Sequence, residues 1–376
     1  MDSLRPWFVL RAVPGIGDAL VCRLVQSFGS ADAVLRASHE ELTQVGGVNH
    51  ALAKAIRQGP APAELRAIDR EIGELARLPV RVLTILDSEY PVRLKAIHDP
   101  PPMLYVSGSV GEEDHHAVAV VGTRHPTPAG RLVAEQLAHG LADAGLTVVS
   151  GLARGIDGTA HRSALQAGGR TIAVLGCGID RTYPPEHQSL RKTIEERGAV
   201  LCELPLGAYP YAYHFPKRNR IISGLSLGVV VVEAAPDSGS LITARLAAEQ
   251  GRDVFAVPGA VHSEQSRGTN GLLKQGARLV ETVRDVLDEL AAQFEPSFRA
   301  RVEDRLAALT RPVQSGRVSL EQDEATLYAA LSAEPVHIDE LIARTGLPAA
   351  LVSGLLLSLE LKGAVRQLPG RSCMRV

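Results

Sequence analysis

The chain has 376 residues, 45% of them hydrophobic, and a formal net charge of −2. This length predicts two or three domains, and the near-neutral charge excludes a whole-surface attraction to nucleic acid, so any such binding must come from a local basic patch. Four scattered cysteines and the lack of a long apolar stretch predict a reduced, cytoplasmic protein without zinc site, disulfide framework or membrane segment.

Residues 1–78 are predicted to form a helical domain, because apolar residues recur there at three- and four-residue spacing between glycine pairs. Residues 13–17 (Val-Pro-Gly-Ile-Gly) precede an amphipathic helix, and residues 45–48 (Val-Gly-Gly-Val) are a weaker copy. This pattern is typical of a helix-hairpin-helix (SAM-like) unit, whose backbone N–H groups hold DNA phosphates. A purely structural helix pair is the alternative, and Asp18, which would repel a phosphate, favours it.

From residue 79 to residue 290, short Val/Ile-rich runs alternate with helical stretches. Continuous apolar runs predict strands buried on both faces, and therefore a mainly parallel sheet covered by helices. The alternation predicts a doubly wound, Rossmann-like α/β domain. The six expected strands are Ala117–Val121, Thr147–Val149, Thr171–Leu175, Ala199–Cys202, Val229–Val232 and Val254–Val257.

Residues 291–321 are predicted to be a linker with a short helix at Phe298–Leu309. Residues 322–376 follow the order helix, helix-turn-helix, hairpin that is typical of a winged-helix domain. Residues 323–376 hold five Lys/Arg and six Asp/Glu, a net charge of −1, and the presumed recognition helix has no cation before Lys362. Because a major-groove reader brings Arg, Asn or Gln to the base edges, a protein-contact or accessory role is favoured. Only the wing arginines would touch DNA: Arg366, Arg371 and Arg375.

Glycines, hydroxyls and arginines collect where the predicted strands end. Ligands of open parallel sheets bind outside these carboxyl ends; glycine permits close backbone approach, and hydroxyl and N–H groups at helix starts bind anions. A single glycine-containing turn of this kind is explained by the tight connection from strand to helix, but several such turns at one edge predict a polyanion site. The turns contribute Gly122, Thr123, Arg124, Ser150, Gly151, Arg154, Gly155, Ser238, Gly239, Ser240 and Thr243.

Residues 213–220 place cations beside aromatic rings. Cations that meet phosphates and rings that stack on bases suit a nucleic-acid strand, whereas a plain helix start with solvated charges is the alternative for this segment alone. We predict that Phe215 stacks on or wedges beside a base and that Asn219 lies in the same site. Phosphates would be neutralised by Arg124, Lys217, Arg218 and Arg220. A structural ion pair with Asp157 or Glu233 is the alternative for Arg154 and Arg220.

Signatures of common enzymes are missing from the sequence. Arg181 stands where a dinucleotide fingerprint needs glycine, and no P-loop or H-E-x-x-H string occurs. His161 follows Asp157 by four residues, which suits an acid–base pair, but a capping aspartate with a packed histidine is favoured. We therefore predict no catalytic residue, no metal and no cofactor.

Seven strings in order over residues 115–280 resemble the bacterial DNA-processing protein A family, also called DprA or Smf. They are VGTR (121–124), SGLARGID (150–157), YPPEH (183–187), FPKRNRIISGL (215–225), VEA and SGSLITA (within 232–244) and VPGA (257–260). The resemblance implies a protein that binds single-stranded DNA, forms homodimers through its Rossmann-like domain, and protects incoming DNA and loads the RecA recombinase during natural transformation. It also implies a DNA pocket lined by Arg124 and residues 215–220, with phosphate contacts from residues 238–243.

One departure concerns Ala212, which stands where several relatives have a basic residue, so that either Lys217 substitutes or the strand path differs. The implied partners are single-stranded DNA and RecA, with single-stranded DNA-binding protein as a further candidate. A phosphoribohydrolase-type enzyme that cleaves nucleoside monophosphates is the alternative; its glycine-rich motif is followed by a glutamate, whereas here no acid follows until Glu249. A pure adaptor is a third reading. Candidate dimer contacts lie near Leu225–Leu227 or after Leu272.

Overall fold

The computed structural model describes residues 3–310, 322–332, 334–361, 364–368 and 370–375. The chain divides into two compact units, Met1–Val302 and Glu303–Val376. Residues 311–321 of the expected linker, together with Lys362, lie outside the described residues. Within the described ranges, no single helix has the length and apolar character to cross a membrane, although the bent pair Ile338–Thr345 and Ala349–Glu360 meets that test jointly.

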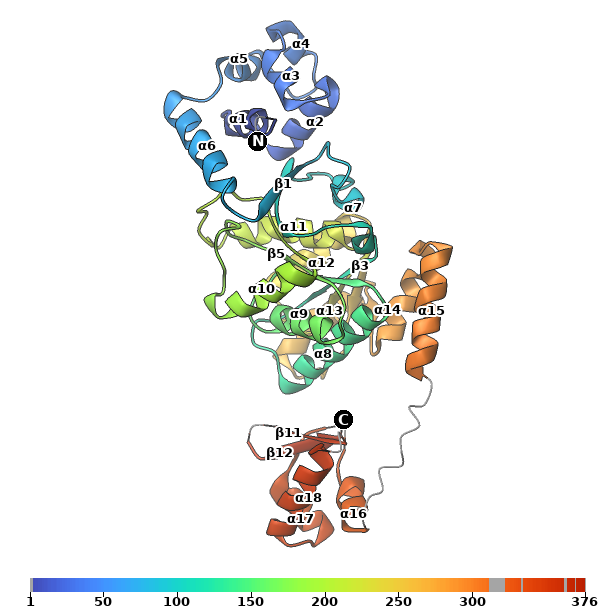
Figure 1. Ribbon diagram of the computed structural model, residues 1–376. Coiled ribbons are helices and arrows are strands. Elements are labelled where there is room, and N and C mark those ends of the chain that lie inside the picture. The colour runs from blue at the N-terminus through green and yellow to red at the C-terminus, as the bar shows by residue number, and fades with distance from the viewer. Residues whose placement is uncertain (1–2, 311–321, 333, 362–363, 369, 376) are drawn as a thin grey trace. The chain divides into compact units, whose positions relative to one another are not determined.

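The first part of unit 1 is helical, as predicted (Figure 1). Side-chain caps start several of these helices: Ser30, Ser38 and Asn49 each accept a hydrogen bond from a backbone N–H two or three residues into the following helix. The apolar faces meet in a core that includes Leu10 and Leu24. The helices are α1 (Arg5–Ala12), α2 (Asp18–Phe28), α3 (Ala31–Arg36), α4 (His39–Thr43), α5 (His50–Gln58) and α6 (Pro62–Leu75).

A nine-stranded sheet with the order β1-β2-β6-β5-β4-β3-β7-β8-β9 forms the centre of unit 1. The pairs from β6 to β9 are parallel, whereas β1–β2 and β2–β6 are antiparallel. The mainly parallel sheet is thus confirmed. The strands are β1 (Val80–Thr84), β2 (Met103–Gly108), β3 (Ala117–Val121), β4 (Thr147–Ser150), β5 (Thr171–Val174), β6 (Ala199–Cys202), β7 (Gly228–Val231), β8 (Asp253–Ala256) and β9 (Arg278–Leu279).

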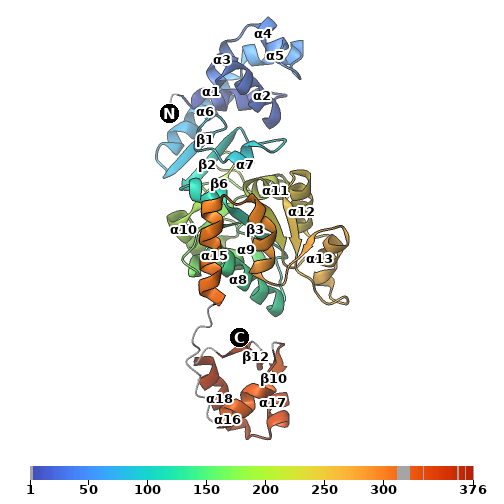
Figure 2. The same cartoon turned by 90° about the vertical axis from the view of Figure 1, so that its right-hand side faces the viewer.

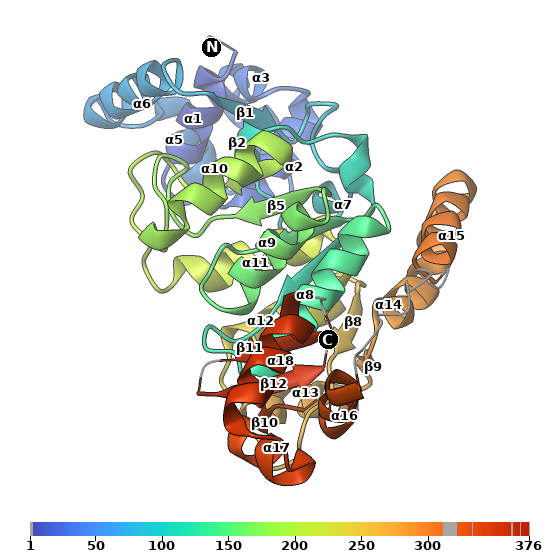
Figure 3. The same ribbon diagram turned by 60° about the horizontal axis from the view of Figure 1, so that its bottom comes forward.

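Helices cover both faces of this sheet (Figure 2). Helices α8, α9 and α10 lie side by side on one face (Figure 3), and α11 packs with α12 on the other. Leu225 and Leu227 are buried within the chain, so these two side chains are not exposed candidates for a dimer contact. The remaining helices of unit 1 and the helix that continues past it are α7 (Val92–Lys95), α8 (Pro128–Asp143), α9 (Ile156–Gln166), α10 (Gln188–Arg197), α11 (His214–Leu225), α12 (Gly239–Glu249), α13 (Glu264–Lys274), α14 (Val283–Leu290) and α15 (Pro296–Thr310).

Unit 2 has its own apolar core and the predicted winged-helix order. In the sheet order β10-β12-β11, the hairpin strand β12 pairs with both β10 and β11. Arg375, expected to be able to touch DNA, instead donates to the carbonyl oxygen of Tyr328 at 3.0 Å and lies over its ring. The elements are α16 (Gln322–Ala330), β10 (Val336–His337), α17 (Ile338–Thr345), α18 (Ala349–Leu361), β11 (Val365–Leu368) and β12 (Ser372–Arg375).

Candidate nucleic-acid interface

A groove of roughly 670 Å³ lies at the carboxyl ends of β3 and β7. These strands are neighbours in the sheet, although the chain runs through β4, β5 and β6 between them. Such a switch point is where open α/β sheets bind ligands. The lining brings together most of the residues predicted from sequence: Gly122, Thr123, Arg124, Phe215, Arg218, Asn219, Ser238, Gly239, Ser240 and Thr243.

The side of α11 that faces the groove is set by helical periodicity. Phe215, Arg218, Asn219 and Ile222 have the spacing i, i+3, i+4, i+7, and all four line the groove. Lys217 and Arg220, which are three residues apart, do not belong to this row and do not line the groove. The basic string of α11 is therefore divided between two faces of one helix.

Arg124 and Phe215 form the part of the lining best suited to a strand. The Cζ atom of Arg124 lies 5.5 Å from the centre of the Phe215 ring, within cation–π range. Arg124 is exposed and Phe215 is half-buried; no described carboxylate forms an ion pair with Arg124. The ring of Tyr183 lies 5.6 Å from that of Phe215. The groove thus offers an available cation beside two accessible aromatic rings.

Arg218 lies beneath the groove and is 4% exposed. Its Nη1 donates to the carbonyl oxygen of Gly151 at 2.8 Å and also to that of Val174. Burial lowers the pKa of Arg218 to about 10, so the side chain remains charged at neutral pH. A direct phosphate contact was predicted for Arg218, but the guanidinium is bound to backbone carbonyls. Its charge acts on the groove from below.

Asp157 is the buried carboxylate opposite Arg218. It accepts hydrogen bonds from the N–H groups of Gly151 at 3.1 Å and Ala153 at 3.4 Å. Burial raises the pKa of Asp157, and the charge of Arg218 acts in the opposite direction. Asp157 thus lies in the first turn of α9 and holds the preceding loop, but α9 has no side-chain cap, so the expectation of a capping aspartate is wrong. The pairing of Arg154 or Arg220 with Asp157 is not observed.

His161 is packed in the interior, as favoured from sequence. It is fully buried, and its Nδ1 lies 2.6 Å from Oγ1 of Thr171. Burial lowers the pKa of His161 to about 3. Its partner is a threonine hydroxyl rather than Asp157, so the two side chains do not form an acid–base pair.

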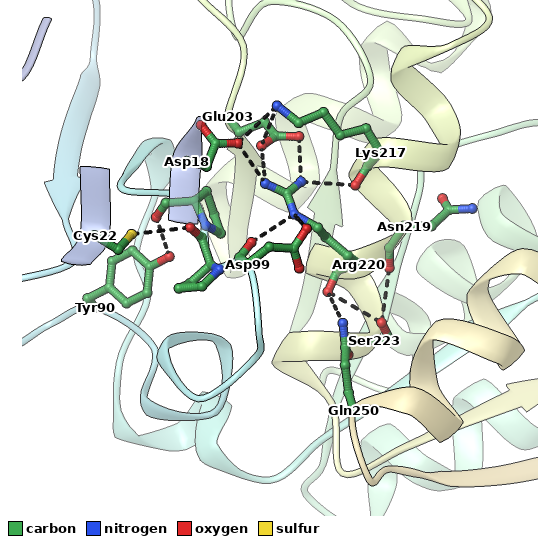
Figure 4. Close-up of polar contacts among 12 residues, drawn as sticks. Asp18, Cys22, Tyr90, Asp99, Glu203, Lys217, Asn219, Arg220, Ser223 and Gln250 are labelled. Carbon is green, nitrogen blue, oxygen red and sulfur yellow. Dashed lines mark hydrogen bonds and ion pairs between the residues drawn. The ribbon is translucent and has the colours of Figure 1, made fainter. Parts of the chain in front are cut away.

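Arg220 is the centre of an ion cluster on the other face of α11 (Figure 4). Its two Nη atoms donate to the carboxylate of Glu203 at 2.8 and 2.7 Å, and Nη2 donates to Asp18 at 3.1 Å. Asp99 lies 3.1 Å from its Nε. With 3% exposure and three carboxylate partners, Arg220 cannot reach a phosphate, and the prediction for this residue is corrected to a structural ion pair.

Lys217 belongs to the same cluster (Figure 4). Its Nζ lies 3.0 Å from Asp18 and 3.6 Å from Glu203, and its side chain is half exposed. Asp18 begins α2 directly after the first glycine hairpin. That hairpin therefore places a carboxylate against α11, which agrees with the structural alternative for the helix pair.

The turns after β3 and β4 touch each other beside the groove. The N–H of Ile156 donates to the carbonyl oxygen of Thr123 at 3.2 Å. Gly155 has a φ of 73°, and a Cβ there would lie 2.3 Å from that oxygen. Glycine is required for this contact. Gly155, predicted to contact DNA, is assigned to packing.

The other predicted residues of the β4 turn lie off the groove. Ser150 is buried and its Oγ donates to the carbonyl oxygen of Val120 at 2.7 Å. Arg154 is exposed and pairs with Glu186, not with Asp157 or Glu233. Gly151 and Arg154 do border a small depression next to the groove, together with Arg124, Tyr183 and Phe215.

The start of α12 supplies polar groups to the opposite wall. Ser238 caps the helix, and its Oγ lies 2.8 Å from Oγ of Ser240. Nδ2 of Asn219 donates to the carbonyl oxygen of Gly239 at 3.3 Å, which joins α11 to this turn. A capped helix start with free N–H groups attracts an anion, although Asp237 also lines the groove.

Sequence reasoning missed Tyr183, Asp18 and Glu203. Tyr183 stands in the quoted YPPEH string, so its position near other motif residues was a usable signal. Asp18 and Glu203 lie far from α11 in sequence, and nothing local indicates that they pair with it.

Three protein-family models match the chain. The family model for DNA recombination-mediator protein A matches residues 81–291, the one for the DprA winged helix domain matches 312–371, and that for the SAM-like helix-hairpin-helix tandem matches 9–79. Protein Smf from Synechocystis sp. is 35% identical, and the match covers 98% of each chain.

Two solved structures are also similar. The X-ray structure of DNA processing protein A from Streptococcus pneumoniae has a TM-score of 0.66 at 35% identity, covering 77% of this chain and 98% of that one. DNA processing protein A from Helicobacter pylori, whose structure concerns a single-stranded DNA binding mode, has a TM-score of 0.52 at 30% identity, covering 58% of this chain and 99% of that one.

Proposed function

The chain belongs to the DNA recombination-mediator protein A family, whose members are named DprA or Smf, and from this premise we propose that its groove binds a short segment of single-stranded DNA. The H. pylori relative, described for its single-stranded DNA binding mode, supports this choice of ligand. The polar, cation-bearing groove at the switch point supports it independently.

The placement of Arg124 above Phe215 carries the proposal. In the proposed complex Arg124 neutralises a phosphate while Phe215 stacks on a base, with Tyr183 at its side. Stacking of this kind contributes about 1–3 kcal/mol per base. An unpaired base presents its π face to such a ring, whereas a base inside a duplex does not, so the site should prefer single strands.

The rest of the groove supplies anion contacts in this proposal. Gly122, Thr123, Ser238, Gly239, Ser240 and Thr243 offer backbone or hydroxyl donors along the two walls. Arg218 contributes its charge through the groove floor. Lys217 joins only if it leaves Asp18, and Gly151 and Arg154 meet the strand at the neighbouring depression.

We further propose that the protein acts in the cytoplasm as a homodimer, because two short sites on one strand bind far better than one. Its role would be to protect incoming DNA and to load RecA during natural transformation, with single-stranded DNA-binding protein as another partner. The family description as a recombination mediator supports this role. A non-enzymatic function is included, since Asp157, the buried carboxylate of the groove, is committed to backbone N–H groups.

Titration of labelled oligonucleotides at several salt concentrations tests the proposal. We expect single strands to bind more tightly than duplexes of equal length, with an affinity that falls as salt rises. Equal binding of both forms, or none, would exclude the proposed groove complex. Incubation of the protein with AMP, with the products separated by chromatography, tests the phosphoribohydrolase alternative. That alternative requires AMP to be cleaved.

A further inference from the structure

Three exposed tyrosines lie in one five-residue segment, residues 209–213, between β6 and α11. Tyr209, Tyr211 and Tyr213 are 56%, 53% and 68% exposed, and the whole chain contains seven tyrosines. Single exposed apolar side chains are ordinary, but a contiguous group of large rings marks a binding surface. We call these three residues the tyrosine ledge.

The rings of the ledge are arranged in an ordered way. Tyr211 and Tyr213 are nearly parallel, with an interplanar angle of 10° and centres 5.7 Å apart, and Tyr209 lies 6.2 Å from Tyr211. His214 packs edge-on against Tyr213 at 4.4 Å. Cζ of Arg181 lies 4.1 Å from the centre of the Tyr209 ring. The ledge is thus a row of rings with a cation at one end.

Backbone hydrogen bonds hold the ledge in place. The N–H of Tyr211 donates to the carbonyl oxygen of Tyr209 at 2.8 Å, and Nδ1 of His214 lies 2.9 Å from that same oxygen. The N–H of Gly178 donates to the carbonyl oxygen of Ala208 at 2.9 Å. Because these bonds hold the backbone that carries the rings, a ligand that stacks on the rings need not order this part of the loop.

The ledge is continuous with the groove. Pro210 and Ala212, which alternate with the tyrosines, line the groove, as does Phe215. The tyrosines themselves do not line it and instead face solvent. A strand that leaves the groove past Phe215 therefore meets the rings next.

We propose that the tyrosine ledge stacks the unpaired bases of a single strand where that strand leaves the groove. This inference rests on the proposed function of the groove. Every base has a π face, so a row of rings binds unpaired bases without regard to sequence. Arg181 lies where a phosphate of the same strand would be attracted. A strand that uses the ledge is longer than one that fills the groove alone.

Binding to two oligothymidines separates the ledge from the groove, one of about 5 nucleotides that fills the groove and one of about 15 that also reaches the ledge. The double variant Tyr211→Ala/Tyr213→Ala should bind the short strand within about twofold of the unmodified protein but the long strand roughly tenfold or more weakly. The matched control Tyr211→Phe/Tyr213→Phe keeps both rings and should bind both strands normally.

A long strand whose distal positions are abasic supplies a second readout. This strand keeps the phosphates but lacks the distal bases. The unmodified protein should therefore bind it about tenfold more weakly than the complete long strand, whereas the alanine variant should bind both long strands equally. An equal loss for short and long strands, or no loss for either, would overturn the ledge. So would a change in the sedimentation mass of the alanine variant without a change in DNA affinity, which would assign the ledge to a second copy of the chain. If the unmodified protein binds neither strand, the groove proposal itself fails.

Discussion

Asp18 accepts a hydrogen bond at 3.1 Å from Nη2 of Arg220, although 202 residues separate them in the sequence. The contact joins the first turn of α2 to the buried face of α11. Because the opposite face of α11 lines the groove, the N-terminal helices and the candidate DNA site share one helix.

Arg124→Ala should weaken single-strand binding and reduce the slope of log affinity against log salt by roughly 0.7, the contribution of one phosphate contact on a single strand. The measurement is a series of titrations at increasing salt. Lys217→Ala is the control, because Lys217 pairs with Asp18 outside the groove lining, and its slope should stay unchanged. An equal drop for both variants would place the strand across the Asp18 side of α11 instead.

Gly176→Ala should weaken DNA binding without touching the ligand itself. A Cβ at Gly176 would lie 2.8 Å from Cδ1 of Phe215, so the ring must move out of its present position. We expect a loss of about tenfold or more, comparable with Phe215→Ala. In a Phe215→Ala background the Gly176 substitution should have no further effect. Additive losses would show that Gly176 acts through something other than the ring.

Glu203→Gln should lower the free energy of unfolding by about 3 kcal/mol, because it leaves a buried guanidinium short of its main partner. Asp18→Asn should cost less, about 1–2 kcal/mol, since Arg220 keeps Glu203. Denaturant unfolding measures both. Asp69→Asn breaks the exposed pair with Arg5 and should leave the midpoint unchanged. If all three variants unfold alike, the cluster around Arg220 does not hold the N-terminal helices.

His161 should make the fold sensitive to acid. Burial holds its pKa at about 3, below the ordinary value of about 6.5, so the unfolded chain takes up the proton first as the pH falls. The contribution of neutral His161 to the free energy of unfolding is complete above about pH 6.5 and is lost progressively down to about pH 3. Relative to His161→Asn, the unmodified protein should lose about 1.4 kcal/mol per pH unit below about pH 6. Parallel stability curves for the two proteins would contradict this.

Much of the fold follows from local pattern. Six of the seven strands in the parallel part of the sheet were predicted within about one residue, because strands buried on both faces are continuous apolar runs. Strands β1 and β2 form the antiparallel part of the sheet and were missed. The residues of β1 vary in burial, whereas β2 is buried over five of its six residues and its apolar run was overlooked. Strand β9, Arg278–Leu279, is too short to leave a pattern.

The candidate site was predicted less evenly. The glycine-rich turns after β3 and β7 do meet at one groove, because parallel strands bring their carboxyl ends to the same edge. The cations of α11 were all assigned to DNA, whereas Arg218 and Arg220 are buried. Helical spacing separates the Phe215–Arg218 row from Lys217 and Arg220, and that signal was available. The carboxylates that neutralise Arg220 come from distant segments, and only the tertiary structure reveals them.

The ion cluster around Arg220 also bears on how this chain can be divided. A fragment that begins at β1 would lack Asp18, one of the three carboxylate partners of Arg220. Arg220 would keep Glu203 and Asp99, but Lys217 and Arg220 would lose the carboxylate that they share. Trimming the chain at that boundary would therefore alter the helix that carries Phe215. A lower DNA affinity of such a fragment would not by itself show that the missing helices contact the strand.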